Sequence, residues 1–139
     1  MKFIKKYGII LLAVAVLGGI LYLNRFSSAS RVKRGQTLYT QKCANCHGDR
    51  GQGLKKLIPP LAGSDYVAAR MGDLPCIMRY GISGEISVNG QVYNQPMTGV
   101  MDLEADEIKS IIDYMVASWY PDAESPSHAE VSAALENCR

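Results

Sequence analysis

The sequence predicts a mostly helical domain with one small β-hairpin, and three observations support this fold class. Residues 104–119 carry apolar side chains at helical spacing behind a cluster of acidic residues. Ser127 is followed three residues later by Glu130, the capping box that begins many helices. Residues 86–93 alternate in polarity around an Asn-Gly pair, which is the strongest short signal for a hairpin. The chain of 139 residues is long enough for one such domain.

The first thirty residues differ from the rest. Three lysines precede an apolar run, Tyr7–Leu23, and Arg25 follows it. This layout is typical of an export signal or a membrane anchor. The run is longer than a usual signal core but shorter than the roughly 20 residues that span a bilayer comfortably. We expect residues 1–30 to form an anchor or signal segment, with an N-terminal transmembrane helix as the favoured form. A cleaved signal, with Ser28 and Ser30 at the cleavage site, and an ordinary core helix are the alternatives.

The remaining elements follow from capping residues, prolines and periodicity. Ser30 and Ser64 are suited to cap helices, and Pro75 is tolerated in a first helical turn. The pair Pro59-Pro60 forces an extended chain. The expected elements are helices at about 31–42, 64–72, 74–80, 104–119 and 127–137, with a hairpin at 86–93. We therefore divide the rest of the chain into a domain at 31–120 and a tail helix at 121–139.

The densest group of potential ligands is Cys43-Ala44-Asn45-Cys46-His47. A thioredoxin-like dithiol would need a strand–helix setting, whereas this motif ends a helix and enters a loop. A structural zinc site would need a second cysteine or histidine pair at related spacing. The other candidate ligands are scattered and form no such pair: Cys76, His128 and Cys138.

Cys-x-x-Cys-His is the attachment site of c-type haem. Two thiols at this spacing can form thioethers with the vinyl groups along one side of a porphyrin, and the adjacent imidazole of His47 points at the iron. The motif therefore predicts one haem c, bound covalently through Cys43 and Cys46. Such attachment occurs outside the cytoplasm. We accordingly expect the haem domain on the periplasmic side of a bacterial inner membrane.

The second axial ligand decides what the iron does. The candidates are Met71, Met78, Met97, Met101, Met115 and His128. Met97 differs from the others because it lies in an expected non-helical loop behind Pro96, with enough chain after His47 to reach the opposite haem face. We predict His47 and Met97 as the iron ligands. This ligation raises the reduction potential and closes the iron to substrates, which favours electron transfer over catalysis.

With these residues in place, the chain resembles class I cytochromes c, especially small membrane-anchored bacterial ones. The resemblance covers residues 31–120 and rests on these positions: Gly35, Tyr39, Cys43–Gly48, Pro60-Leu61, Met97, Leu103–Ile108, Tyr114 and Trp119. It implies a fold of about four to five short helices around one haem. It also implies that the first and last helices of the domain cross at Gly35, and that the stretch at Pro60 and Leu61 presents a carbonyl to His47. The sequence departs from the family pattern at Thr98, where many members have proline.

Two cysteines remain outside the motif. In an oxidising compartment, Cys76 and Cys138 most simply pair as a disulfide. A buried Cys76 with a free Cys138 is the alternative.

Charge is distributed unevenly along the domain. Residues 31–79 hold nine Lys/Arg against three Asp/Glu, and residues 80–139 hold two against ten. This polarity either orients the domain on a charged partner or is an ordinary solvated surface. We expect no nucleic-acid partner, because no basic stripe with interleaved aromatic residues occurs.

The resemblance implies a single-haem electron carrier between a quinol-oxidising complex and a terminal oxidase, with no small-molecule substrate. It also allows a fixed subunit of such a complex, for example of an alternative complex III. The alternatives are a haem subunit of a substrate dehydrogenase and, less favoured, a haem peroxidase or gas-binding protein.

Overall fold

The computed structural model describes the backbone of residues 2–138 and the side chains of residues 10–21 and 27–138. The chain divides into two compact units, Met1–Arg31 and Val32–Arg139. Helix α1 (Lys2–Lys42) is continuous, so the expected helix start at Ser30 is wrong. No proline interrupts this helix, and the Ser30 hydroxyl donates backwards to the Ser27 carbonyl at 2.8 Å instead of capping a new helix.

In the first unit, the described apolar side chains are exposed. They are Ile10, Leu11, Leu12, Val14, Val16, Leu17, Ile20 and Leu21. Among the residues whose side chains are described, no helix is both long enough and apolar enough to cross a membrane. The transmembrane helix expected within residues 1–30 is not found among these residues, and the side chains of residues 1–9 and 22–26 lie outside the described set.

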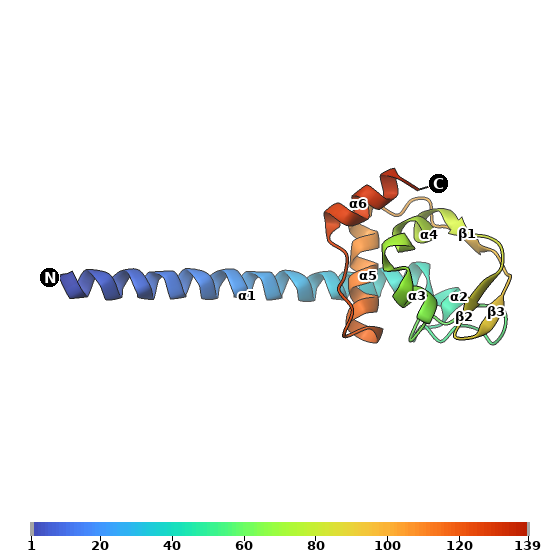
Figure 1. Cartoon of the computed structure of the whole chain (residues 1–139), viewed down its shortest axis with the longest axis horizontal. Coiled ribbons are helices and arrows are strands. Elements are labelled where there is room, and N and C mark those ends of the chain that lie inside the picture. The colour runs from blue at the N-terminus through green and yellow to red at the C-terminus, as the bar shows by residue number, and fades with distance from the viewer. Residues whose placement is uncertain (1, 139) are drawn as a thin grey trace. The chain divides into compact units, whose positions relative to one another are not determined.

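The second unit is built mainly from short helices (Figure 1). They are α2 (Ala44–His47), α3 (Asp65–Ala69), the 3₁₀ helix η1 (Met71–Asp73), α4 (Leu74–Tyr80), α5 (Ala105–Trp119) and α6 (His128–Glu136). Unlike the cap expected at Ser30, those at Ser64 and Ser127 are present: Ser64 accepts a hydrogen bond from the Val67 amide at 3.2 Å, and Ser127 forms a capping box with Glu130. The mostly helical fold class predicted from the sequence is confirmed.

Two small antiparallel sheets complete the domain. Strands β2 (Ile86–Val88) and β3 (Gln91–Tyr93) form the predicted hairpin around Asn89-Gly90, whose φ angles of 51° and 76° suit a tight turn. The second sheet was not predicted: β1 (Gly81–Ile82) pairs with β4 (Met97–Thr98). Met97 therefore lies in a strand pair and not in a free loop.

The core forms where α1 crosses α5. A Cβ atom on Gly35 would lie 1.8 Å from the Ser110 carbonyl oxygen, so only glycine allows the two helices to approach this closely. Beside the crossing, the rings of Tyr39, Tyr114 and Trp119 contact one another with centroids 5.3–5.6 Å apart. Helix α5 also contributes fully buried side chains to this core, including Ile108, Ile111, Ile112 and Met115.

The carboxy-terminal tail belongs to this core. Helix α6 packs on α4 and α5, and Val131 on α6 is completely buried. Cys76 on α4 and Cys138 after α6 are joined by a disulfide, the pair expected from the sequence. Packing and a covalent link therefore both hold the tail against α4.

Candidate functional site

One cavity of about 330 Å³ brings the predicted site residues together. The residues predicted from the sequence all line it: Cys43, Cys46, His47, Pro60, Leu61 and Met97. Its remaining walls are mostly apolar and come from several helices, the β2–β3 hairpin and the loops between them. They include Leu74, Ile77, Val88, Leu103 and Met115. The domain thus encloses a site suited to a large apolar group with polar contacts at one wall.

The cysteine motif forms a single helical turn directly after α1. The amides of Cys46 and His47 both donate to the Cys43 carbonyl, at 3.1 and 3.0 Å. This turn directs both cysteines and the histidine toward the same cavity. The Cys43 side chain is half-buried, whereas that of Cys46 is exposed, so the cavity reaches the surface beside Cys46.

His47 is buried and its ring is oriented by a main-chain acceptor. Its Nδ1 lies 3.1 Å from the Pro59 carbonyl oxygen, and because a carbonyl can only accept, Nδ1 must carry the proton. Burial lowers the pKa of His47, outweighing the opposite effect of the Pro59 hydrogen bond, so the neutral form is favoured. The other ring nitrogen, Nε2, is then left with a lone pair for a metal.

The carbonyl that contacts His47 belongs to Pro59 and not to the predicted Pro60–Leu61 stretch. Pro60 and Leu61 line the cavity, and the Leu61 carbonyl instead accepts a hydrogen bond from the Tyr120 hydroxyl. The resemblance placed the acceptor one residue too late, because the sequence of this loop does not specify which of the two proline carbonyls faces the imidazole.

Tyr120 was not predicted as a site residue, yet it holds the wall behind His47. Besides donating to Leu61, its hydroxyl accepts a hydrogen bond from the Ser64 amide at 2.9 Å. The Leu61 amide is in turn bonded to the Gly51 carbonyl at 2.8 Å. The only sequence signal at Tyr120 was its position directly after a predicted helix, and that position does not indicate a hydrogen bond to Leu61.

The two other chemistries considered for the cysteine motif fit poorly. Burial, with a smaller effect from Cys46, raises the pKa of the Cys43 thiol to about 11. A redox dithiol requires the opposite, a nucleophilic thiolate with a lowered pKa. Among the described residues, no cluster of three or more His, Cys, Asp or Glu side chains is arranged to hold a metal ion. A zinc site therefore lacks the ligand set that it needs.

Three methionines line the cavity: Met78, Met97 and Met115. Met78 and Met115 are buried in helices as part of the hydrophobic core, whereas Met97 lies on β4 and is half-buried. Met71, Met101 and His128 are outside the cavity lining, and the Met101 side chain is 69% exposed. The structure thus reduces the six candidates for a second axial ligand to three.

Comparison with known proteins agrees with this geometry. The sequence profile of the family described as "Cytochrome c" matches residues 32–119. The chain belongs to the cytochrome c family. It is 33% identical over 113 residues to a cytochrome c-552 of Thermus thermophilus, covering 78% of this chain and 70% of the relative. A second cytochrome c-552 of Thermus thermophilus is 35% identical over 89 residues, covering 61% of this chain and 67% of that relative. Cytochrome c-554(547) of Halothiobacillus neapolitanus is 29% identical over 85 residues, covering 56% and 89% of the two chains.

Family membership gives the motif its meaning. This cytochrome c carries haem c covalently through Cys43 and Cys46, and it is an electron-transfer protein. The cavity fits such a group, because it is walled by apolar side chains and brings the two thiols and a buried, neutral imidazole to one side. Cytochromes of this family are typically extracytoplasmic and act through redox protein partners.

Proposed function

We propose that this cytochrome c transfers single electrons with His47 and Met97 as the axial ligands of its haem iron. The observation that carries the proposal is the single cavity lined by Cys43, Cys46, His47 and Met97. The iron supplies a one-electron couple. A site closed by histidine and methionine favours a high potential and excludes substrates.

The surrounding residues would prepare the site for fast transfer. The Pro59 carbonyl fixes the tautomer and ring angle of His47, and such a contact also raises the basicity of a ligating imidazole. Tyr120 holds the segment that carries this carbonyl. A preorganised site of this kind changes little between the two oxidation states, which keeps the cost of reorganisation small.

We propose that electrons enter and leave at the surface formed by the exposed Cys46 and the loop at 54–58. Leu57 in this loop is 60% exposed and lines the cavity, while Leu54 is 50% exposed. Lys55 and Lys56 lie beside these leucines and are exposed. An apolar contact flanked by lysines suits a brief encounter with an acidic partner, at the low end of interface sizes and sensitive to salt.

The location and the partners are also part of this proposal. We infer that residues 1–30 direct the domain out of the cytoplasm and keep it at a membrane. The exposed apolar side chains of residues 10–21 support this inference. By family resemblance, the partners are a quinol-oxidising complex and a terminal oxidase. The alternative to a free carrier is a fixed subunit of one such complex or of a substrate dehydrogenase. Gentle purification of the native protein, followed by identification of the proteins that accompany it, separates a free carrier from a fixed subunit.

Carbon monoxide added to the reduced protein tests the electron-carrier assignment. If both axial positions are filled by protein side chains, carbon monoxide must first displace the methionine, so the absorption spectrum of the ferrous protein changes only slowly. An immediate and complete spectral shift would mean an open iron, and the protein would then be a peroxidase or a gas-binding protein instead of a carrier.

A further inference from the structure

We propose that Arg79 is a positioning residue that keeps Met97 directed into the haem cavity, acting through the segment that follows Met97. This inference rests on the proposed role of Met97 as an axial ligand. Arg79 lies on α4 and does not line the cavity. Any effect on the iron must therefore pass through the chain between Met97 and α5.

The Met97 strand is fixed at one end by backbone contacts to the end of α4. In the β1–β4 pair, Ile82 stands opposite Met97 and Gly81 stands opposite Thr98. A Cβ atom on Gly99 would lie 2.4 Å from the Arg79 carbonyl oxygen and 2.5 Å from the Gly81 nitrogen. The segment therefore lies directly against the α4–β1 junction, with no space for a side chain between them.

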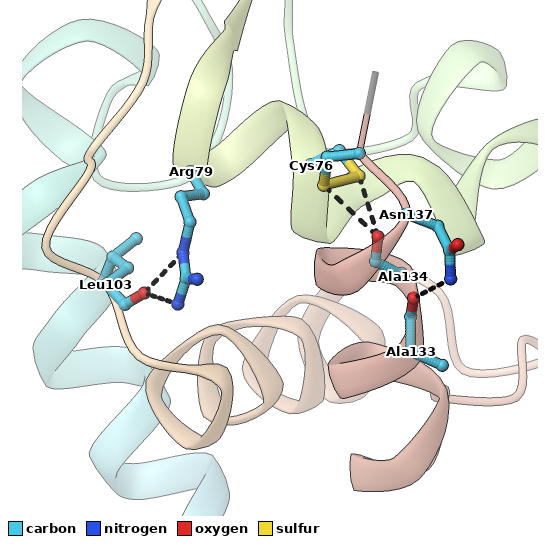
Figure 2. The surroundings of a disulfide bond; sticks show 7 residues. Cys76, Arg79, Leu103, Ala133, Ala134 and Asn137 are labelled. Carbon is cyan, nitrogen blue, oxygen red and sulfur yellow. Dashed lines mark hydrogen bonds between the residues drawn. A yellow bond between two sulfur atoms is a disulfide. The ribbon is translucent and has the colours of Figure 1, made fainter.

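Two further hydrogen bonds fasten the rest of the segment to α4. The Val100 amide donates to the Met78 carbonyl at 2.9 Å. Three residues later, the Arg79 guanidinium donates to the Leu103 carbonyl through Nε at 3.0 Å and also through Nη2 (Figure 2). Because the Leu103 amide also donates to the Val100 carbonyl at 3.1 Å, residues 100–103 form a turn that is closed on α4 at both ends.

Among the described residues, Arg79 is the stronger of two side-chain attachments of this turn. The other is an ion pair between Lys42 and Asp102, whose carboxylate side chain is 75% exposed. Exposed pairs of that kind contribute little. The Leu103 side chain, in contrast, is 2% exposed, and the forked bond to its carbonyl involves a charged donor.

Helix α4 is itself a fixed support for this contact. Its Cys76 is joined to Cys138 by the disulfide, and the Cys76 sulfur lies 3.4 Å from the Ala134 carbonyl on α6 (Figure 2). The tail is therefore connected to the Met97 segment in three steps. The disulfide joins α6 to α4, Arg79 on α4 bonds the Leu103 carbonyl, and the 100–103 turn leads back to Met97. Loss of the Arg79 side chain would free the Leu103 end of this turn and leave α4 attached to α6.

The test compares holoprotein variants at Arg79 with a matched control. Arg79→Met keeps the apolar stem but removes both donors. Arg79→Lys keeps the charge but replaces the forked guanidinium with a single ammonium group. Arg70→Met is the control, because Arg70 is an exposed arginine that forms an exposed ion pair with Asp73 and lies over the half-buried Tyr66 ring, away from the Met97 segment. Three quantities are measured: the rate of carbon monoxide binding to the ferrous protein, the red absorption band of ferric iron bound by methionine, and hydrogen exchange of the Val100 amide.

We expect Arg79→Met to bind carbon monoxide about tenfold faster or more, because a charge-assisted hydrogen bond no longer opposes displacement of the methionine. Exchange of the Val100 amide rises by a similar factor, and the red band is weakened. In all three measurements Arg79→Lys gives values between those of Arg79→Met and the parent, and Arg70→Met gives the values of the parent. If Arg79→Met does not yield folded holoprotein, the intermediate behaviour of Arg79→Lys carries the test.

The outcomes separate this proposal from the one on which it rests. If Met97→Ala leaves the red band and the resistance to carbon monoxide as in the parent, Met97 is not the ligand and both proposals fail. If Met97→Ala opens the iron while the Arg79 variants keep the parental rate, band and Val100 exchange, only the role of Arg79 is overturned. A lower denaturation midpoint in Arg79→Met without those spectroscopic changes would likewise reduce Arg79 to a structural residue.

Discussion

The Gly35→Ala substitution tests how the domain is held together around its haem site. On the surface of an ordinary helix this change stabilises the protein by about 0.5–1 kcal/mol, because alanine is the better helix former. Here the added Cβ would lie 1.8 Å from the Ser110 carbonyl oxygen and 2.5 Å from its carbon. Comfortable contacts lie near ~3.5 Å, so α5 must retreat from α1 by more than ~1 Å.

Both blocking atoms belong to the backbone of a buried helix, so no side-chain rotation can relieve the clash. We place the strain at the upper end of the overpacking range, about 3 kcal/mol, which leaves a net loss of about 2 kcal/mol after the gain in helix propensity. For a domain of this size the loss corresponds to a decrease in melting temperature of roughly 10 °C.

Guanidinium denaturation of the holoprotein, followed by far-ultraviolet circular dichroism, measures this loss. Gly72→Ala is the matched control, because a Cβ at Gly72 meets no atom within 4 Å. We expect Gly72→Ala to be neutral or slightly stabilising. If Gly35→Ala were as stable as the parent, the close helix crossing derived from Gly35 and Ser110 would be wrong.

Three further predictions concern the tail and the wall behind His47. Removal of the disulfide by Cys76→Ser with Cys138→Ser should cost about 4 kcal/mol for a link across 62 residues, measured by denaturation; an unchanged midpoint would show that the bridge does not form. Tyr120→Phe should cost about 1–3 kcal/mol, because the Leu61 carbonyl and the Ser64 amide lose their partner, and a loss below that range would mean that water replaces the hydroxyl. Hydrogen bonds from Ser127 lower the pKa of Glu130, so this carboxylate stabilises α6 at higher pH and the stabilisation is lost as the pH falls below about 4.5. In Glu130→Gln, the denaturation midpoint should depend less on pH in that range than in the parent.

The regular elements of the domain could be predicted because local residues specify them. Ser64, the Ser127–Glu130 box and the Asn89-Gly90 turn each act within a few residues, and the structure contains all three. The β1–β4 pair could not be predicted, because two-residue strands show no alternation and form only where distant segments meet. The helix start at Ser30 failed because a capping serine competes weakly with an uninterrupted helix.

The candidate site shows the same division between local and long-range information. The cysteine motif is contiguous, so its cofactor followed from the sequence. The acceptor of the His47 proton depends on the path of a loop, and this is why Pro59, and not the expected stretch at Pro60, makes that contact. Tyr120 and Arg79 bond to carbonyls 59 and 24 residues away in the chain, and nothing in their local sequence indicates those contacts.

The axial ligation of the iron is the central claim, and magnetic circular dichroism of the ferric protein in the near infrared measures it most directly. We predict the transition characteristic of histidine with methionine in the parent protein, its loss in Met97→Ala, and its retention in Met101→Ala and Met78→Leu. Met101 is exposed and outside the cavity, whereas Met78 lines it, so the two controls separate general damage from a competing ligand. A signal typical of two nitrogen ligands, or one that survives in Met97→Ala, would contradict the proposed electron-transfer site.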